Sequence, residues 1–82
     1  MRAFFTDLKG KTVMTKEGDI LGTLEDFIAN TRTGHLESML IAPAQTVEPR
    51  LYGTDAKGRI LLPFKSMHAV RDVVVVDTEA LH

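Results

Sequence analysis

Short apolar segments alternate with polar turns along the chain, and most of these turns contain glycine. No window sustains an apolar repeat of helical period between convincing caps, so the segments are predicted to be strands. The first predicted strand covers residues 11–15 and the second covers residues 20–29. Gly18 lies in the turn between them and can adopt positive φ without a Cβ penalty, so the two strands are predicted to form a hairpin.

The second predicted strand does not follow a strict two-residue alternation. Leu21, Leu24 and Phe27 are spaced three residues apart. A β-bulge near Gly22 would let all three face one buried side, because glycine within a strand often marks a bulge or the corner of a barrel.

A polar turn at residues 30–34 precedes a third apolar segment, which predicts a strand over residues 35–42. Helix is the alternative for residues 24–28 and 36–41, because apolar residues three and four apart also fit one face of a helix.

The apolar pattern stops between residues 43 and 59, where prolines and glycines intervene. An irregular segment of this length is uncommon in a small domain, and long loops are frequent sites of function. The loop of residues 43–58 is therefore a candidate protein-interaction surface, with Leu51 and Tyr52 as its candidate contact residues.

The rest of the chain predicts three more strands, at residues 59–62, 68–70 and 73–77. A turn at residues 55–58 leads into the first of them, and the bend at residues 64–67 has room for one helical turn. The pattern therefore predicts an all-β fold: a small barrel of about five or six antiparallel strands, forming a single domain over the 82 residues.

The run of four valines at residues 73–76 is apolar on both sides of its strand. At least one valine should then face outward from a single sheet layer unless a partner covers it. A domain near 80 residues also buries only roughly 60–65% of its unfolded surface, so it has little stability in reserve. We expect a dimer, with a second copy or a paralogue, and Val74 and Val76 as interaction residues.

Two adjacent aromatic residues, Phe4 and Phe5, lie near the start of the chain. Adjacent residues of an extended segment point to opposite sides, so one should pack in the core and the other could anchor a partner. Phe4 and Phe5 are therefore both candidate interaction residues.

Composition narrows the function classes. The net charge is −1 and cysteine is absent, which disfavours direct nucleic-acid binding and excludes disulfides and thiolate metal sites. No apolar run approaches the roughly 18 residues of a membrane span. A cytoplasmic protein is expected, with any membrane association through a partner.

Candidate chemistry is sparse. His35, His68 and His82 have no second ligand at the spacing of a known metal site, and no nucleophile or phosphate-binding motif occurs. Glu25 and Asp26 are adjacent, but neighbouring strand residues point to opposite faces and cannot easily share a proton. No catalytic residue, cofactor or metal is expected.

Four segments, taken in order, resemble the PRC-barrel family. They are LKGKTV at 8–13, EGDILGTLED at 17–26, LPF at 62–64 and VRDVVVV at 70–76. The family pattern is a leucine and glycine before the first strand, an acidic-glycine turn, an I/L-G-x-V/L stretch, a proline-aromatic pair and a closing valine-rich strand. Many relatives have tryptophan where this chain has Phe64, and a buried phenylalanine would keep the packing role.

The resemblance implies a domain that makes protein contacts, as in the photosynthetic reaction centre H subunit and in a ribosome maturation factor. Chains of this length look most like small archaeal PRC-barrel proteins. Some of those dimerise and link a membrane-anchored partner to the cell-division ring through the adaptor SepF. The resemblance therefore implies a non-enzymatic adaptor recruited to the division site, and a factor for RNA processing or ribosome maturation is the alternative.

Overall fold

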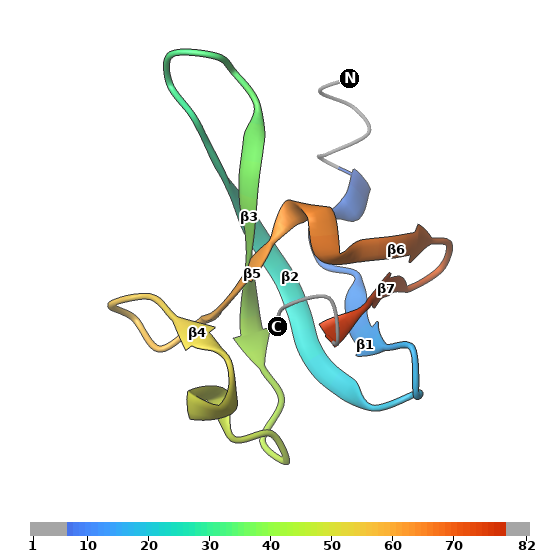
Figure 1. Ribbon diagram of the computed structural model, residues 1–82. Coiled ribbons are helices and arrows are strands. Elements are labelled where there is room, and N and C mark those ends of the chain that lie inside the picture. The colour runs from blue at the N-terminus through green and yellow to red at the C-terminus, as the bar shows by residue number, and fades with distance from the viewer. Residues whose placement is uncertain (1–6, 79–82) are drawn as a thin grey trace.

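The computed structural model describes residues 7–78, which form seven strands and two 3₁₀ helices (Figure 1). In chain order they are β1 (Thr12–Thr15), β2 (Ile20–Ala29), β3 (Leu36–Pro43), η1 (Pro49–Leu51), β4 (Gly53–Thr54), β5 (Ile60–Pro63), η2 (Phe64–Ser66), β6 (Met67–Val70) and β7 (Val74–Val76). The all-β prediction is confirmed, and the alternative helices at residues 24–28 and 36–41 are strand.

All seven strands belong to one sheet in the order β4-β5-β3-β2-β1-β7-β6. The prediction of five or six antiparallel strands was wrong in two respects. The two-residue strand β4 had no sequence signal, and β1 pairs with β7 in parallel, through Val13 and Val74 among others. The sheet is therefore mixed.

The sheet is rolled. β5 and β6 are five strand positions apart, which corresponds to about 24 Å in a flat sheet. Only four residue steps, from Pro63 to Met67, join the two strands, and four steps reach at most about 14 Å. The two flanks of the sheet must therefore curl toward each other, and Figure 1 shows η2 crossing between them.

The roll is not a closed barrel. β4 and β6 are the two edges of the sheet, and no strand ladder joins them within residues 7–78. The predicted closed sheet is thus corrected to an open, barrel-like one, in which the short connection through η2 replaces the missing ladder.

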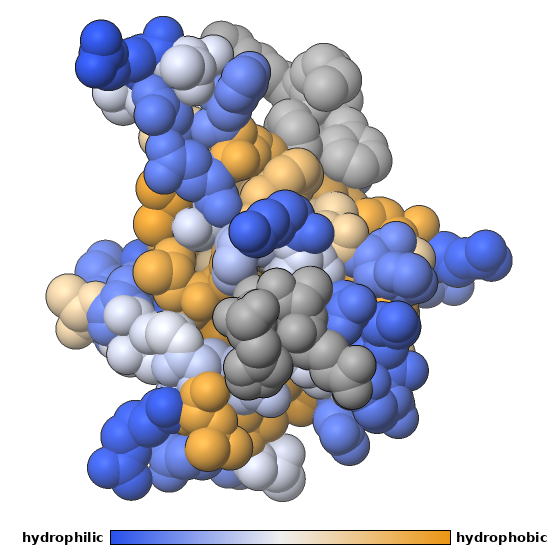
Figure 2. All heavy atoms as spheres, viewed as in Figure 1, coloured by the Kyte–Doolittle hydropathy of each residue, from blue (hydrophilic) through white to orange (hydrophobic). Residues whose placement is uncertain are grey.

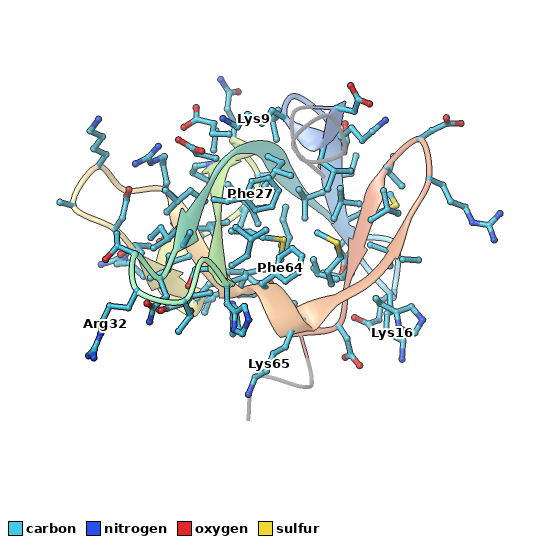
Figure 3. All side chains as sticks on the ribbon, turned by 90° about the horizontal axis from the view of Figure 1, so that it is seen from above. Lys9, Lys16, Phe27, Arg32, Phe64 and Lys65 are labelled. Atoms are coloured by element: carbon cyan, nitrogen blue, oxygen red, sulfur yellow. The ribbon has the colours of Figure 1, made fainter. Side chains whose placement is uncertain are left out.

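Hydrogen bonds and aromatic packing hold η2 in place. The Ser66 hydroxyl donates to the Pro63 carbonyl oxygen at 2.7 Å, and the Asp77 backbone N–H donates to the Ser66 carbonyl at 2.8 Å. Phe64 meets Phe27 of β2 edge to face, with ring centroids 6.1 Å apart, in the interior (Figure 3). The predicted helical turn is confirmed, and Phe64 is partly buried and packs against the core.

Inward residues of the strands, together with Leu8 before β1, form one core inside the roll. Its buried members are Leu8, Val13, Leu21, Leu24, Met39, Ile41, Ile60, Leu62, Val74 and Val76. Burial of this apolar surface is the main force that stabilises the fold.

The predicted bulge at the start of β2 is confirmed. Val13 pairs with Gly22 and Met14 pairs with Ile20, so Leu21 is the additional residue. A second bulge lies at Glu25, where Leu24 pairs with Ile41 and Asp26 with Leu40. Bulges bend and twist a strand, which lets the ten-residue β2 follow the roll.

Gly22 is required at the first bulge. A Cβ atom there would collide with the Ala42 carbonyl oxygen and lie 2.8 Å from the carbonyl carbon, and the backbone has a φ of +156°. The two strands approach each other too closely for any side chain.

Gly22→Ala should therefore lower the free energy of unfolding by about 3 kcal/mol or more, because the backbone of β3 would have to move. Gly18→Ala is the control: its φ is +94° with open space around the position, and it should lose only about 1–2 kcal/mol. Urea unfolding measures both. Equal losses would contradict the close-approach argument.

Candidate interaction surfaces

Two of the predicted interaction residues lie in the core. Val74 and Val76 are 0% exposed, so the prediction that they face a partner was wrong. Side chains alternate along a strand, and a shift of one residue exchanges the two faces. Val75 is the outward valine of β7 and is half-buried.

Val75 belongs to a row of outward apolar side chains that crosses four neighbouring strands. Ile20 of β2 pairs with Met14 of β1, Met14 with Val75, and Val75 with Ala69 of β6. Ile20 is 51% exposed and the other three are half-buried. We call Ile20, Met14, Val75 and Ala69 the methionine–valine row.

A second apolar surface lies on the outer side of the other flank. Leu40 of β3, which is only 5% exposed, pairs with the half-buried Leu61 of β5, and both alternate with core residues of their strands. Ile28, which is 39% exposed, and Pro63 both pair with Ser38 beside them. We call Ile28, Leu40, Leu61 and Pro63 the leucine patch. Figure 2 shows apolar side chains gathered on this flank, between the polar β2–β3 hairpin and β4.

Neither surface was predicted, although a signal for each was present. Residues 39–41 and 60–62 are apolar on both faces of their strands, as the valine run is. Ile20 and Met14 had no such signal, because their shared direction depends on the bulge beside them.

The candidate loop residues Leu51 and Tyr52 take different positions. Leu51 at the end of η1 is 77% exposed, whereas Tyr52 packs against the core together with Val47. Leu51 stands two residues before Gly53, which pairs with Leu61 of the leucine patch. The candidates Phe4 and Phe5 lie outside the described residues.

An ionic network borders the leucine patch. The Arg59 guanidinium donates to Asp55 at 2.8 Å and to Glu25 at 3.4 Å. Burial acts to raise the pKa of Asp55, but hydrogen bonds from Arg59 and from the Lys57 backbone N–H outweigh it and leave this pKa below its ordinary value. The hydrogen bond to Asp55 in turn raises the pKa of Arg59.

The adjacent carboxylates Glu25 and Asp26 have separate partners. Glu25 contacts Arg59, and Asp26 pairs with the Lys9 ammonium at 3.2 Å. The Phe27 backbone N–H and the Lys9 side chain lower the pKa of Asp26. Each carboxylate has its own cation, so the pair is arranged as an ionic surface.

His35 and His68 are exposed, and His82 lies outside the described residues. Within residues 7–78, no three His, Cys, Asp or Glu side chains are grouped so that they could hold a metal ion. Over the same residues, no helix has the length and apolar character needed to cross a membrane.

The fold and these surfaces define a small all-β domain, one rolled mixed sheet with apolar side chains on both its inner and outer faces. The chain belongs to the PRC-barrel domain family, which it matches over residues 1–82, so the family predicted from its motifs is confirmed. It is similar to an uncharacterized protein of Methanocaldococcus jannaschii (MJ1118), with 29% identity over 73 residues that cover 88% of this chain and 78% of that protein.

The lowered pKa of Asp55 predicts a dependence of stability on pH. A carboxylate whose pKa is lower in the folded state stabilises the fold above its unfolded pKa, and this contribution is lost as pH falls through the folded value. The free energy of unfolding of the wild type should therefore fall between about pH 5 and about pH 2.

Asp55→Asn should make this fall smaller, because asparagine keeps an oxygen for the turn but has no charge. Arg59→Gln should also make the fall smaller, and the double variant should flatten the slope by less than the sum of the two single variants, because both remove the contact between Asp55 and Arg59. Urea unfolding across this pH range measures the slopes. An unchanged slope in Asp55→Asn would show that the Arg59 contact contributes nothing.

Proposed function

We propose that this chain is a non-enzymatic protein-interaction adaptor. The observation that carries the proposal is the presence of separate apolar surfaces on the outside of one small sheet: the methionine–valine row on one flank and the leucine patch on the other. An adaptor must bind two partners at once, and two surfaces on opposite flanks permit this.

The leucine patch, together with Leu51, is the surface proposed for a different protein. Interfaces between unlike proteins combine an apolar centre with a polar rim, and arginine is enriched in them relative to the rest of the surface. Leu51 supplies exposed apolar area and Leu61 is half-buried, while Arg59 with its two carboxylates supplies the rim.

The context proposed for this adaptor is archaeal cell division, in the cytoplasm. The family and the similarity to an archaeal protein support it. In this role the chain links a membrane-anchored partner to the division ring and binds SepF, and it reaches the membrane only through that partner.

Leu51→Glu tests the proposal directly. Leu51 is largely exposed, so the fold should be unaffected, while a buried charge at the contact should weaken binding to SepF of the same organism by about tenfold or more. Ala56→Glu adds the same charge at an exposed position of the neighbouring turn and should bind as the wild type does. Isothermal titration calorimetry measures the affinities.

Two results would count against the proposed function. One is absence of measurable binding between the wild type and SepF. The other is co-sedimentation of the tagged protein with ribosomal subunits from native lysate, which would favour the ribosome-maturation alternative.

A further inference from the structure

We propose that the edge of β2 at residues 26–29 binds an extended segment of the partner protein as an additional strand. This inference rests on the proposed function, and it names how the partner contacts the flank that carries the leucine patch. The bound segment has a basic side chain beside Asp26 and an apolar side chain beside Ile28. Three observations support the proposal: the direction of the main chain, the charge at the edge and the position of the leucine patch.

This edge of β2 has no neighbouring strand within residues 7–78. On the side of β1, the main-chain contacts of β2 reach Leu24, whose carbonyl accepts the Gly10 N–H at 2.8 Å and whose N–H donates to the Lys11 carbonyl at 2.9 Å. On the other side, β2 continues to pair with β3 as far as Ala29. The second half of β2 is therefore one side of a two-stranded hairpin, which extends beyond the other strands in Figure 1.

Main-chain groups of alternate residues point toward this edge. The Asn30 N–H donates to the His35 carbonyl at 2.8 Å, so it points toward the side of β3. Hydrogen-bonding groups of successive strand residues point to opposite sides, which directs those of Ala29 and Phe27 toward the edge. The Phe27 N–H agrees with this direction, because it donates to the Asp26 carboxylate at 2.8 Å. Two residues therefore face the edge at the spacing of a regular ladder.

The Asp26 carboxylate covers this edge. It accepts the Phe27 N–H, and the Lys9 ammonium pairs with it at 3.2 Å. Charged side chains commonly protect strand edges in this way. The Lys9 and Asp26 side chains are about half exposed, and ion pairs of this kind contribute little free energy. A carbonyl oxygen of an added strand can therefore replace the carboxylate at the Phe27 N–H at small cost.

The displaced carboxylate determines the charge of the partner segment. Asp26 and Ile28 point outward, because Phe27 between them packs against the core on the inner side of β2 (Figure 3). Outward side chains of an added strand lie directly beside these two. A lysine or arginine beside Asp26 pairs with the displaced carboxylate, and an apolar side chain beside Ile28 covers a residue that is 39% exposed.

The leucine patch is continuous with this edge. Asp26 pairs with Leu40 of β3, and Leu40 pairs with Leu61 of β5, so the three outward side chains form one row across the flank. A strand added to β2 extends this row by one position. In strand addition, main-chain hydrogen bonds supply affinity and alternate side chains supply specificity. The added strand and the leucine patch thus form a single contact surface for one partner.

Ala29→Pro tests the edge directly. Proline lacks the N–H that an added strand would use, and a strand edge tolerates proline where that N–H lies outside the ladder. The affinity for SepF of the same organism should fall by about tenfold or more in isothermal titration calorimetry. Ala29→Val keeps the N–H and should bind as the wild type does. Equal affinities of Ala29→Pro and the wild type would overturn the proposal.

Hydrogen exchange tests the same contact in the wild-type chain. The Ala29 amide should exchange about tenfold or more slowly in the SepF complex than in the protein alone, because the added strand protects it. The Asn30 amide is the internal reference, since its bond to His35 is present in both states. Unchanged exchange at Ala29 in the complex would contradict strand addition.

Two synthetic peptides test the charge without SepF. One is Ser-Thr-Ile-Thr-Lys-Thr, and the other has glutamate in place of lysine. The lysine peptide should shift the amide resonances of Phe27 and Ala29, and the glutamate peptide should bind about threefold or more weakly. Asp26→Lys should reverse this preference. Absence of shifts at these amides, or the same preference in both proteins, would refute the assigned chemistry.

The outcomes separate this inference from the proposed function. Absence of SepF binding by the wild type, with the peptide results as expected, overturns only the proposed function. SepF binding that is lost in Leu51→Glu but unchanged in Ala29→Pro overturns only the strand addition. Self-association of the wild type in sedimentation velocity that is lost in Ala29→Pro would assign the edge to a second copy of this chain, and would also overturn the inference.

Discussion

The short connection from β5 to β6 is the constraint on which the rest of this structure depends. Strands five positions apart in the sheet are joined by the three residues of η2, and this is possible only if the sheet curls. Two hydrogen bonds hold Ser66 in this connection: its hydroxyl donates to the Pro63 carbonyl within the turn, and its carbonyl accepts from the Asp77 N–H just after β7. A covalent link with two hydrogen bonds thus takes the place of a closing strand ladder.

The longest strand, β2, must bend to follow the curled sheet, and its two bulges allow it to bend. β2 pairs with β1 on one side and β3 on the other, so it must turn from one flank of the roll to the other. The bulge at Leu21 permits this turn only because Gly22 lets β3 come into contact with the backbone. The bulge at Glu25 has a second effect: it leaves two adjacent carboxylates exposed, each beside a different cation.

The sequence predicts those parts of the fold that depend on local signals. The bounds of β2, the bulge beside Gly22 and the helical turn at Phe64 each follow from residues close together in the chain. The parallel pairing of β1 with β7 joins segments about 60 residues apart, so no turn indicates it. Strand β4 exists only because β5 lies beside it, and Gly53 has no apolar pattern to reveal it. The open edges likewise depend on the whole sheet.

The valine run shows why the candidate surface could be located to a strand but not to its residues. Four identical side chains do not indicate which of them face inward. The register with β1 determines which valines do. Val13 pairs with Val74, and the buried Thr15, whose hydroxyl accepts the Asp19 N–H at 3.1 Å, pairs with Val76. The register with β1 therefore determines the outward face of β7. The same register aligns Met14 of β1 with Val75 of β7. The methionine–valine row is therefore made of residues from both ends of the chain.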